Sequence, residues 1–205
     1  PLYMVIDIMW DFYKEKLGLK KSSYYFNGGL ILYNLDVWRK ENCAERYLDY
    51  LQHCNKQYVL GDQDITNVLF NEQIGVLDLK YNYYSNYYLI NPKYMKSAVG
   101  VDESNYYSGE EMEEAKKSVA IYHCAKYNGE RVWDKENNHP FSEIYNRYKS
   151  ISYWKNEEGW TSNKSKVIKI QLLLQRCLPH RIYIIFLRRA QKQYFKKNEI
   201  LLNQN

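Results

Sequence analysis

The sequence predicts an α/β fold, in which helices flank a mixed sheet and a basic helical tail follows. Three observations predict it. Short apolar runs of strand length alternate with helical patterns between residues 11 and 148. With 45% hydrophobic and 26% charged residues, the 205-residue chain can bury an ordinary core. The basic residues gather at the C-terminus, where residues 164–205 contain ten Lys and Arg against a single acidic residue, Glu199.

The first half of the chain is expected to contain three helices and a buried strand. Residues 11–17 form a short helical pattern that Gly18 ends, and the apolar run GGLILYNL predicts a strand over residues 28–35. Residues 62–70 predict a further helix with apolar residues along one face. Between them, Asp36 is expected to cap a helix, because the apolar residues that follow have helical spacing: Val37, Trp38, Ala44, Tyr47, Leu48 and Leu51.

The second half is expected to add two short strands and two helices. Ser108 and Glu111 form a capping-box pattern, which predicts the start of a helix over residues 110–117. Acidic residues open this helix and lysines end it, as the helix dipole favours. Short apolar runs and helical spacing predict the rest: a strand over 76–79, a Tyr- and Asn-rich loop over 81–88, a strand over 119–123, a loop over 124–131 and a helix over 142–148.

Residues 164–205 are expected to form a tail distinct from a domain over residues 1–163. Apolar and basic residues interleave in two stretches, 167–174 and 181–195, which Pro179 separates, so we expect two amphipathic helices. Such helices bind the headgroup layer of an anionic membrane. The alternative is a last helix that packs its apolar face on the domain and leaves its basic face in solvent. A nucleic-acid partner is not expected, since the tail contains no recognisable binding module.

The cysteines and the hydropathy indicate a cytoplasmic protein. The four cysteines are spread along the chain without a CxxC pair, as in a reduced protein: Cys43, Cys54, Cys124 and Cys177. No stretch approaches the roughly 20 apolar residues of a membrane span, and residues 1–10 lack the pattern of a signal peptide. We therefore expect a cytoplasmic location, at the inner face of the membrane where the tail binds lipid.

Several polar residues are candidates for a site, and each also has an ordinary structural explanation. Asn27 and Gly28 begin a predicted strand, where glycine permits a close approach to the backbone or forms a bulge. Asp62 opens a helix. Its side chain either caps this helix or reaches toward a ligand. His123 ends a strand on the side where α/β sheets bind ligands, although a lone histidine is more often structural. The loop after it contains two cations that either hold a phosphate or face water: Lys126 and Arg131.

Taken in order, these segments resemble the sequence blocks of family 8 glycosyltransferases, retaining enzymes that include lipopolysaccharide galactosyl- and glucosyltransferases. Residues 25–39 (YFNGGLILYNLDVWR) resemble the family's "YFNSGV" block and the "NL-x-x-WR" that follows. Residues 62–67 (DQDITN) resemble its "DQD-x-x-N" helix, and residues 107–123 resemble its late helix and "IIH" strand. Residues 131–133 (RVW) stand in the place of the family's "KPW" triplet, with two extra residues before them. The resemblance covers about residues 11–133.

The resemblance implies a role for each matching position. Asn27 and Gly28 would line the donor sugar and its diphosphate. Asp62 would hydrogen-bond the sugar hydroxyls, and Gln63 would lie on the face where retaining transfer needs a nucleophile or a group that stabilises an oxocarbenium ion. We group these two as the catalytic pair. His123 would bind Mn²⁺ or Mg²⁺, which bridges the two phosphates and offsets the charge of the leaving group. The family lysine beside the diphosphate would be replaced by Arg131 or Lys126.

The resemblance also implies a part of the family fold that precedes these blocks. Family members have the GT-A fold, a Rossmann-like nucleotide-diphospho-sugar transferase fold, whose first half ends in an Asp-x-Asp motif that ligates the metal. Residues 7–11 (DIMWD) do not supply that pair. A hard divalent cation prefers several oxygen ligands, so His123 is expected to need these carboxylates from upstream. We therefore expect this chain to be the carboxyl-terminal part of an incomplete GT-A fold.

The implied function is that of a glycosyltransferase of the lipopolysaccharide biosynthesis type. It would transfer a hexose from a nucleotide-diphosphate sugar to a saccharide or glycolipid acceptor with retention, weakly or not at all in this stretch alone. The alternative is a non-catalytic remnant or interaction module that keeps a membrane-binding basic tail. The two differ in whether a donor sugar is turned over.

Overall fold

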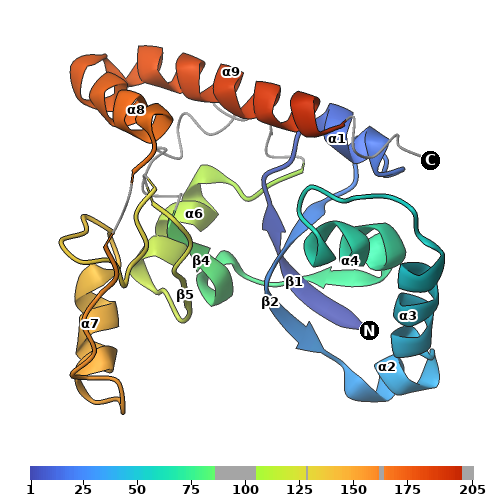
Figure 1. Ribbon diagram of the computed structural model, residues 1–205. Coiled ribbons are helices and arrows are strands. Elements are labelled where there is room, and N and C mark those ends of the chain that lie inside the picture. Colours follow the sequence, from blue (N-terminus) through green and yellow to red (C-terminus); the bar gives the residue numbers. More distant parts are fainter. Residues whose placement is uncertain (86–104, 128, 162–163, 200–205) are drawn as a thin grey trace.

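A three-stranded mixed sheet lies at the centre of the fold. The computed structural model describes residues 1–85, 105–127, 129–161 and 164–199 (Figure 1). Strand β1 (Leu2–Asp7) lies between β2 (Tyr25–Tyr33), to which it runs antiparallel, and β3 (Ile74–Val76), to which it runs parallel. A second sheet pairs β4 (Tyr83–Tyr84) in parallel with β5 (Tyr122–His123).

Helices surround these strands, which confirms the predicted α/β class. Two short 3₁₀ helices, η1 (Asn71–Gln73) and η2 (Leu79–Asn82), flank β3. The α-helices are α1 (Asp11–Lys16), α2 (Leu35–Lys40), α3 (Cys43–His53), α4 (Asp62–Phe70), α6 (Gly109–Lys117), α7 (Ser142–Ser150), α8 (Lys166–Cys177) and α9 (His180–Glu199).

The central strand β1 was not among the expected elements, and β2 begins three residues earlier than predicted. Residues 2–6 are almost entirely buried except for Tyr3, so β1 is a core strand. It pairs with the start of β2, where Val5 opposes Asn27, whereas Met4 opposes Ile31. Residues 28–30 are therefore inserted into β2 relative to β1. They form the bulge that was one expected role of the glycines here.

Three further boundaries differ from the predictions. The expected helix after Asp36 is two helices. The prediction that Asp36 caps it is wrong, because Asp36 lies inside α2 and the cap is Asn34, whose side chain accepts from the Val37 amide. The two helices are separated at Asn42, which has a left-handed φ of 50°. The predicted strand over 76–79 is shifted, because residues 74–76 pair with β1 and Leu79 begins η2.

The other boundaries are close to expectation. Helix α6 carries the predicted capping box, with bonds in both directions between Ser108 and Glu111. The predicted strand over 119–123 is shorter, since only Tyr122 and His123 pair with β4. Part of the predicted loop over 81–88 is structured as the end of η2 and β4, while residues 86–88 lie outside the described part of the chain.

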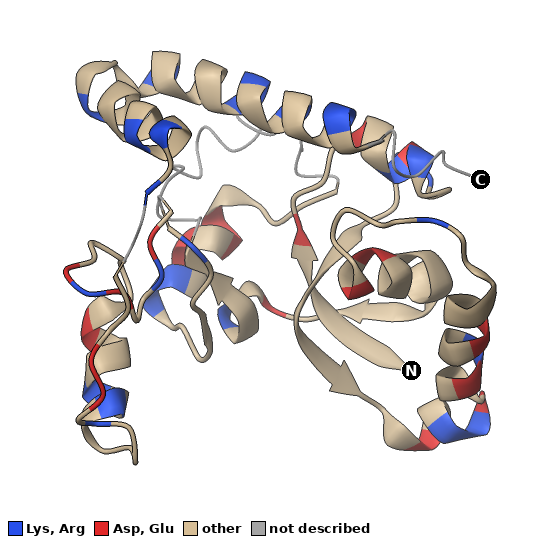
Figure 2. Ribbon diagram, in the orientation of Figure 1, with Lys and Arg blue, Asp and Glu red and all other residues tan. Residues whose placement is uncertain are grey.

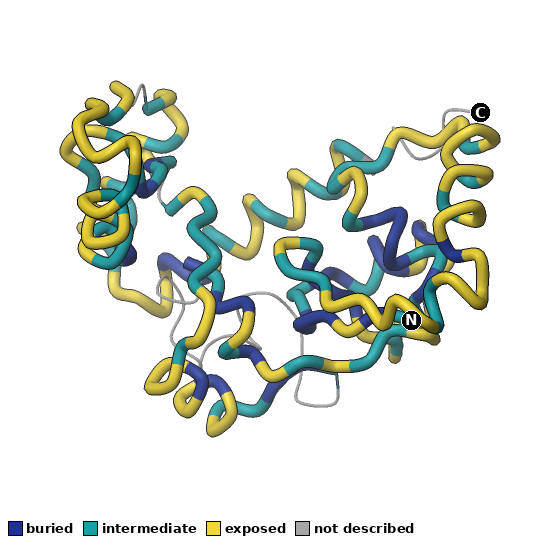
Figure 3. The backbone as a smooth tube through the Cα atoms, turned by 90° about the horizontal axis from the view of Figure 1, so that it is seen from below, coloured by how far each residue is buried: buried dark blue, intermediate teal, exposed yellow. Residues whose placement is uncertain are grey.

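The core joins the sheet to the helices on both sides. Its larger cluster is centred on β1, with Met4 and Val5 fully buried, and reaches Met112 of α6 and Phe141 before α7. A second cluster packs Trp10 and Tyr13 against Tyr25. Helix α4 contributes buried residues along most of its length, whereas Figure 3 shows long exposed stretches on the outside of the molecule.

The tail forms the two predicted helices, and α9 runs along the domain to α1 (Figure 1). The Phe195 ring lies 4.9 Å from the Tyr13 ring, and Tyr183 and Ile184 are buried. The alternative in which the last helix packs on the domain is thus confirmed for one face of α9. Its basic face is not all in solvent, since Arg188 lies 5.8 Å from the Trp10 ring. Throughout the described ranges, no helix has the length and apolar character needed to cross a bilayer.

Candidate functional site

Five polar side chains from five separate elements lie close together in one region, which we call the Asp7 cluster. Its members are Asp7, which ends β1; Asn27, near the start of β2; Gln63, in the first turn of α4; Asn82, which ends η2; and His123, which ends β5. Three of the predicted site residues are therefore members of the cluster, Asn27, Gln63 and His123, and a fourth, Gly28, joins it through its backbone amide. Asp7 and Asn82 were not predicted.

The Asp7 carboxylate accepts hydrogen bonds from two side-chain amides. Asn27 Nδ2 donates to Asp7 Oδ2 over 2.8 Å, and Gln63 Nε2 donates to the same oxygen over 3.0 Å. The Ile8 amide donates to the other oxygen over 2.8 Å. Burial raises the pKa of Asp7, and these three hydrogen bonds oppose the rise because they stabilise the ionised form. The carboxylate thus fixes the orientation of both amide side chains.

The β2 bulge lies directly against Gln63. The Gly28 amide donates to Gln63 Oε1 over 2.8 Å, so this side chain is held at both ends. A Cβ atom at Gly28 would lie 3.2 Å from Gln63 Cβ, which leaves little room for any other residue. Asn27 Oδ1 accepts from the Gly29 amide and from Asn82 Nδ2, each over 2.8 Å. The two glycines therefore allow side chains to lie close to the backbone, in addition to forming the bulge.

His123 lies beside the same bulge. A Cβ atom at Gly29 would lie 2.3 Å from His123 Cε1 and 2.5 Å from Nδ1, so only glycine leaves room for the ring. Burial lowers the pKa of His123, and the charge of Asp7 partly opposes this effect. The imidazole is therefore neutral at pH 7. Its Nδ1 atom is buried and has no hydrogen-bond partner among the described residues.

A neutral imidazole with a buried, unpartnered nitrogen fits the predicted role as a metal ligand. Asn82 Oδ1 is a second buried atom without a hydrogen-bond partner in the described part of the chain. However, the described ranges contain no group of three or more His, Cys, Asp and Glu residues that could hold a metal ion. The residues present fit one end of a metal site, whose other ligands would come from elsewhere.

The two carboxylates of the DQD segment have different environments. Asp62 is exposed, and the helix cap is Gly61, without a side-chain bond, so the interpretation of Asp62 as a cap is wrong. Asp64 is fully buried and accepts from the Tyr13 hydroxyl over 2.6 Å, from the Tyr25 hydroxyl and from the Leu60 amide. Asp64 is a residue that the sequence did not single out, although its DQD neighbours were.

Asn67 fastens α4 to β2; it is the asparagine of the DQD-x-x-N pattern, but no role was predicted for it. Its side chain is buried, donates to the Phe26 carbonyl and accepts from the Phe26 amide, each over 2.8 Å. It also donates to the Gln63 carbonyl over 2.9 Å. The signal was available, because Asn67 follows Gln63 by one helical turn and so lies on the same face of α4. These bonds hold Gln63 against the bulge.

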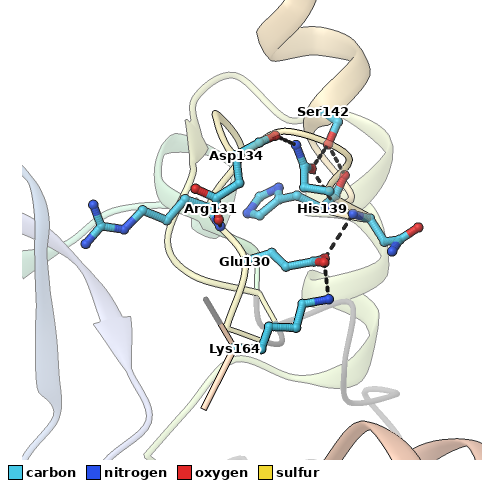
Figure 4. A network of polar contacts seen from close by, with 8 residues as sticks. Glu130, Arg131, Asp134, His139, Ser142 and Lys164 are labelled. Atoms are coloured by element: carbon cyan, nitrogen blue, oxygen red, sulfur yellow. Dashed lines mark hydrogen bonds and ion pairs between the residues drawn. The ribbon is translucent and has the colours of Figure 1, made fainter. Parts of the chain in front are cut away.

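The loop after β5 forms a separate polar network (Figure 4). The Arg131 amide donates to Asp134 Oδ2 over 2.8 Å, and its guanidinium lies 5.4 Å from the Trp133 ring. Figure 4 shows this guanidinium pointing away from the network. Buried Glu130 accepts from the Asn138 amide and forms an ion pair with Lys164, which ties the start of the tail to the loop.

Neither predicted phosphate ligand joins the Asp7 cluster. Lys126 is exposed, and the contacts of Arg131 in the described part of the chain are those with Asp134 and Trp133. Their proposed roles beside a diphosphate remain predictions. The chemistry that the Asp7 cluster offers is a set of fixed amide and carboxylate groups beside a neutral imidazole, which suits a polyhydroxylated ligand and a cation.

Several known proteins are similar to part of this chain. General stress protein A of Bacillus subtilis is 25% identical over 142 residues, which are 68% of this chain and 46% of that protein. The lipopolysaccharide 1,2-glucosyltransferase of Escherichia coli is 37% identical over 60 residues, 28% of this chain and 18% of that protein. A putative glycosyltransferase of Haemophilus influenzae is 31% identical over 78 residues, 38% and 23% of the two chains. The chain thus spans less than half the length of these relatives.

Solved structures share the fold. The apo structure of the bifunctional glycosyltransferase WbbM superposes with a TM-score of 0.57 and 18% identity, over 75% of this chain and 28% of that one. An active-site mutant of LgtC gives 0.51 and 22%, over 71% and 50%. These are GT-A glycosyltransferases, so the predicted fold is confirmed. Residues 4–137 match the sequence profile described as glycosyl transferase family 8, and this chain belongs to that family.

Proposed function

We propose that this chain supplies the donor-sugar and acceptor side of an enzyme that transfers a hexose from a nucleotide-diphosphate sugar to a saccharide or glycolipid acceptor, with retention. The observation that supports the proposal most strongly is Gln63, which is held at one end by the Gly28 amide and at the other by Asp7. A fixed amide costs no reorganisation when charge develops on a bound sugar. Lipopolysaccharide precursors are the acceptor class that we favour.

The residues around Gln63 have the following roles in this proposal. Gln63 Oε1 has a second lone pair that can face a developing oxocarbenium ion. Asp62, exposed at the start of the same helix, accepts hydrogen bonds from sugar hydroxyls. Asn27 and Gly28 line the sugar and its diphosphate, and Asp7 adds negative charge behind Gln63.

His123 and the cations of the loop after β5 are assigned to the metal ion and the diphosphate. His123 Nδ1 would ligate Mn²⁺ or Mg²⁺, together with Asp-x-Asp carboxylates from an upstream half. The bound ion would offset the charge of the nucleoside-diphosphate leaving group. Arg131 or Lys126 would contact the diphosphate, which arginine binds with a planar fork and lysine with a point charge.

The test is a substitution in a protein that contains both halves. Gln63→Ala should reduce donor hydrolysis and transfer by about 100-fold or more, as expected for the loss of one preorganised group. Gln52→Ala, on the exposed side of α3, is the matched control and should leave both rates unchanged. Full activity in a folded Gln63→Ala variant would falsify the assignment, and turnover that persists without divalent cations would contradict the role of His123.

We also propose that the tail binds an anionic membrane surface at the inner face of the cytoplasmic membrane. The observation behind this is a set of exposed apolar side chains on α8 and α9: Val167, Ile170, Leu173, Ile182, Ile185 and Phe186. Lys and Arg recur along the same helices (Figure 2), and cations beside apolar side chains favour anionic lipid. This proposal does not need catalysis, so it also fits a non-catalytic interaction module.

Vesicle sedimentation tests whether α8 faces lipid, and donor turnover then separates an enzyme from a non-catalytic module. Ile170→Asp should weaken binding to vesicles that contain phosphatidylglycerol, whereas Leu48→Asp on α3 should not. The two residues have the same exposed fraction, 58%. Equal binding by both variants would contradict a lipid-facing α8. A chain that binds these vesicles and, when joined to an active upstream half, turns over no donor sugar would support the non-catalytic alternative.

A further inference from the structure

We infer that a groove beside α7 is a saccharide-binding subsite, separate from the Asp7 cluster. The groove lies between α7 and the segment 151–160, which returns along the helix (Figure 1). Its volume is about 500 Å³, within the range of about 300–1,000 Å³ that is usual for small-molecule sites. Five aromatic side chains line it: Trp133, Tyr145, Tyr148, Trp154 and Trp160.

The walls of the groove are tied together by backbone contacts. The Trp160 amide donates to the Trp133 carbonyl over 3.3 Å, and the Lys135 amide donates to the Trp160 carbonyl over 2.8 Å. A Cβ atom at Gly159 would lie 2.7 Å from the Trp133 carbonyl oxygen, so this close approach needs glycine. Lys149 of α7 donates to the Glu157 carbonyl and so joins the helix to the returning segment. The groove is therefore a built feature of the fold.

The aromatic rings in this groove remain exposed. Tyr148, Trp154 and Trp160 are 64%, 59% and 66% exposed, although rings of this size gain free energy when they are covered. Exposed aromatic side chains that gather on a concave surface indicate a binding site. A ligand that covers these rings is therefore expected.

The polar lining selects the chemistry of that ligand. Lys149 and Glu157 line the same groove, where the ammonium has donors beyond its bond to the Glu157 carbonyl and the carboxylate is an acceptor. Ser152 also lines it, and its hydroxyl already donates to the Lys149 carbonyl. A purely apolar ligand would remove these groups from water without replacing their hydrogen bonds. A polyanion would meet the carboxylates of Glu157 and Glu158. A neutral sugar fits both demands, because a pyranose has an apolar C–H face that stacks on rings and hydroxyls around its edge.

Most of the groove lies beyond the family region. The match to family 8 ends at residue 137, before four of the five aromatic residues. Trp133 connects the two parts, since its ring lines the groove and also contacts the Arg131 guanidinium. The choice of a saccharide among neutral ligands rests on the proposed function. We assign the groove to a sugar unit of an oligosaccharide acceptor.

The test measures binding alone, on the whole chain, with lactose and maltotriose. Saturation-transfer difference NMR should show transfer from aromatic protons to the ring protons of at least one sugar, and a fluorescence titration gives the affinity. Trp160→Ala and Tyr148→Ala, on opposite walls, should each weaken binding by about fivefold or more. Tyr153→Ala is the matched control, because Tyr153 is 92% exposed in the same segment but does not line the groove.

Other results would overturn the assignment. These are no saturation transfer to either sugar, unchanged affinity in both groove variants with native circular dichroism, or loss of binding in Gln63→Ala but not in Trp160→Ala, which would place the sugar in the Asp7 cluster. Binding to phosphatidylcholine vesicles that only the groove variants lose, without sugar binding, would assign the rings to lipid instead. Sugar binding that survives in a transfer-inactive Gln63→Ala variant supports the subsite whether or not the proposed function holds.

Discussion

Asp62 and Asp64 lie two positions apart at the start of α4, and the helix turns them into opposite environments. Asp62 is exposed, whereas Asp64 is fully buried between two tyrosine hydroxyls and the Leu60 amide. Burial raises the pKa of Asp64, which the three hydrogen bonds oppose. At the residue scale, the DQD segment thus divides its work: Asp64 anchors the helix, Gln63 faces the bulge and Asp62 faces solvent.

This division predicts a contrast in stability. Asp64→Ala leaves two buried hydroxyls and an amide without their acceptor, so the free energy of unfolding should fall by about 3 kcal/mol or more. Asp62→Ala should change it by no more than about 0.5 kcal/mol. Urea denaturation followed by circular dichroism measures both. Similar losses in the two variants would contradict the assigned anchoring role of Asp64.

Gly29 allows a second prediction at the same scale. Gly29→Ala would place a methyl group 2.3 Å from His123 Cε1, so the ring must move and the variant should be destabilised by about 1–3 kcal/mol. Gly109→Ala is the matched control, since nothing lies within 4 Å of its Cβ position. In a two-half enzyme, Gly29→Ala should also raise the Mn²⁺ concentration needed for activity. An unchanged metal requirement would show that His123 is not a ligand.

At the scale of elements, local patterns predicted the helices better than the strands. The capping box of α6 and the apolar spacing of α4 are contained in a few consecutive residues, so these helices were predictable. The extent of a strand depends on its partner: β2 begins at Tyr25 because Asp7 of β1 pairs with it. Strand pairing also explains why the site was predicted only in part. The family blocks point to Gln63 and His123, whereas Asp7 joins them only through the register of β1.

The packing of α9 on α1 gives a prediction for these elements. Phe195 lies 4.9 Å from the buried Tyr13 ring, whereas the neighbouring Tyr194 is 56% exposed. Phe195→Ala should lower the free energy of unfolding by about 2–4 kcal/mol, because it opens a gap beside Tyr13. Tyr194→Ala should cost less than about 1 kcal/mol. Equal effects in thermal or urea unfolding would mean that α9 is not held on α1 by this contact.

At the scale of the whole molecule, the tail that follows the family region packs back on earlier parts of the chain. The tail is tied to the loop after β5 by the ion pair of Lys164 and Glu130, and α9 ends beside α1. No local pattern predicts which surface a basic amphipathic helix covers, so the sequence left packing and membrane binding equally open. The structure shows that α9 has apolar side chains both buried and exposed, since buried Ile184 has exposed Ile185 and Phe186 as its next neighbours.

The stability of the whole molecule should depend on two histidines that the fold keeps neutral. His139 is buried, and its Nδ1 accepts from the Phe141 amide while its Nε2 lies 2.8 Å from the Ala125 carbonyl, to which it donates. Burial lowers the pKa of His139 and of His123 below the ordinary value of 6.5. As the pH falls below that value, the unfolded chain takes up protons that the folded chain does not, so the free energy of unfolding decreases.

Buried acids act with the opposite sign in a lower range. Burial raises the pKa of Asp7 and Asp64 above 3.8, so between 3.8 and the raised values the folded chain holds more protons and stability falls as the pH rises. The histidine effect is therefore measured nearer to neutrality, by urea unfolding from pH 7.5 down to about 5.5. His139→Gln, which cannot titrate, should flatten the decrease, whereas His53→Gln should not, because the His53 side chain is 75% exposed. A slope that both variants leave unchanged would mean that the buried imidazoles are not what makes the fold sensitive to acid.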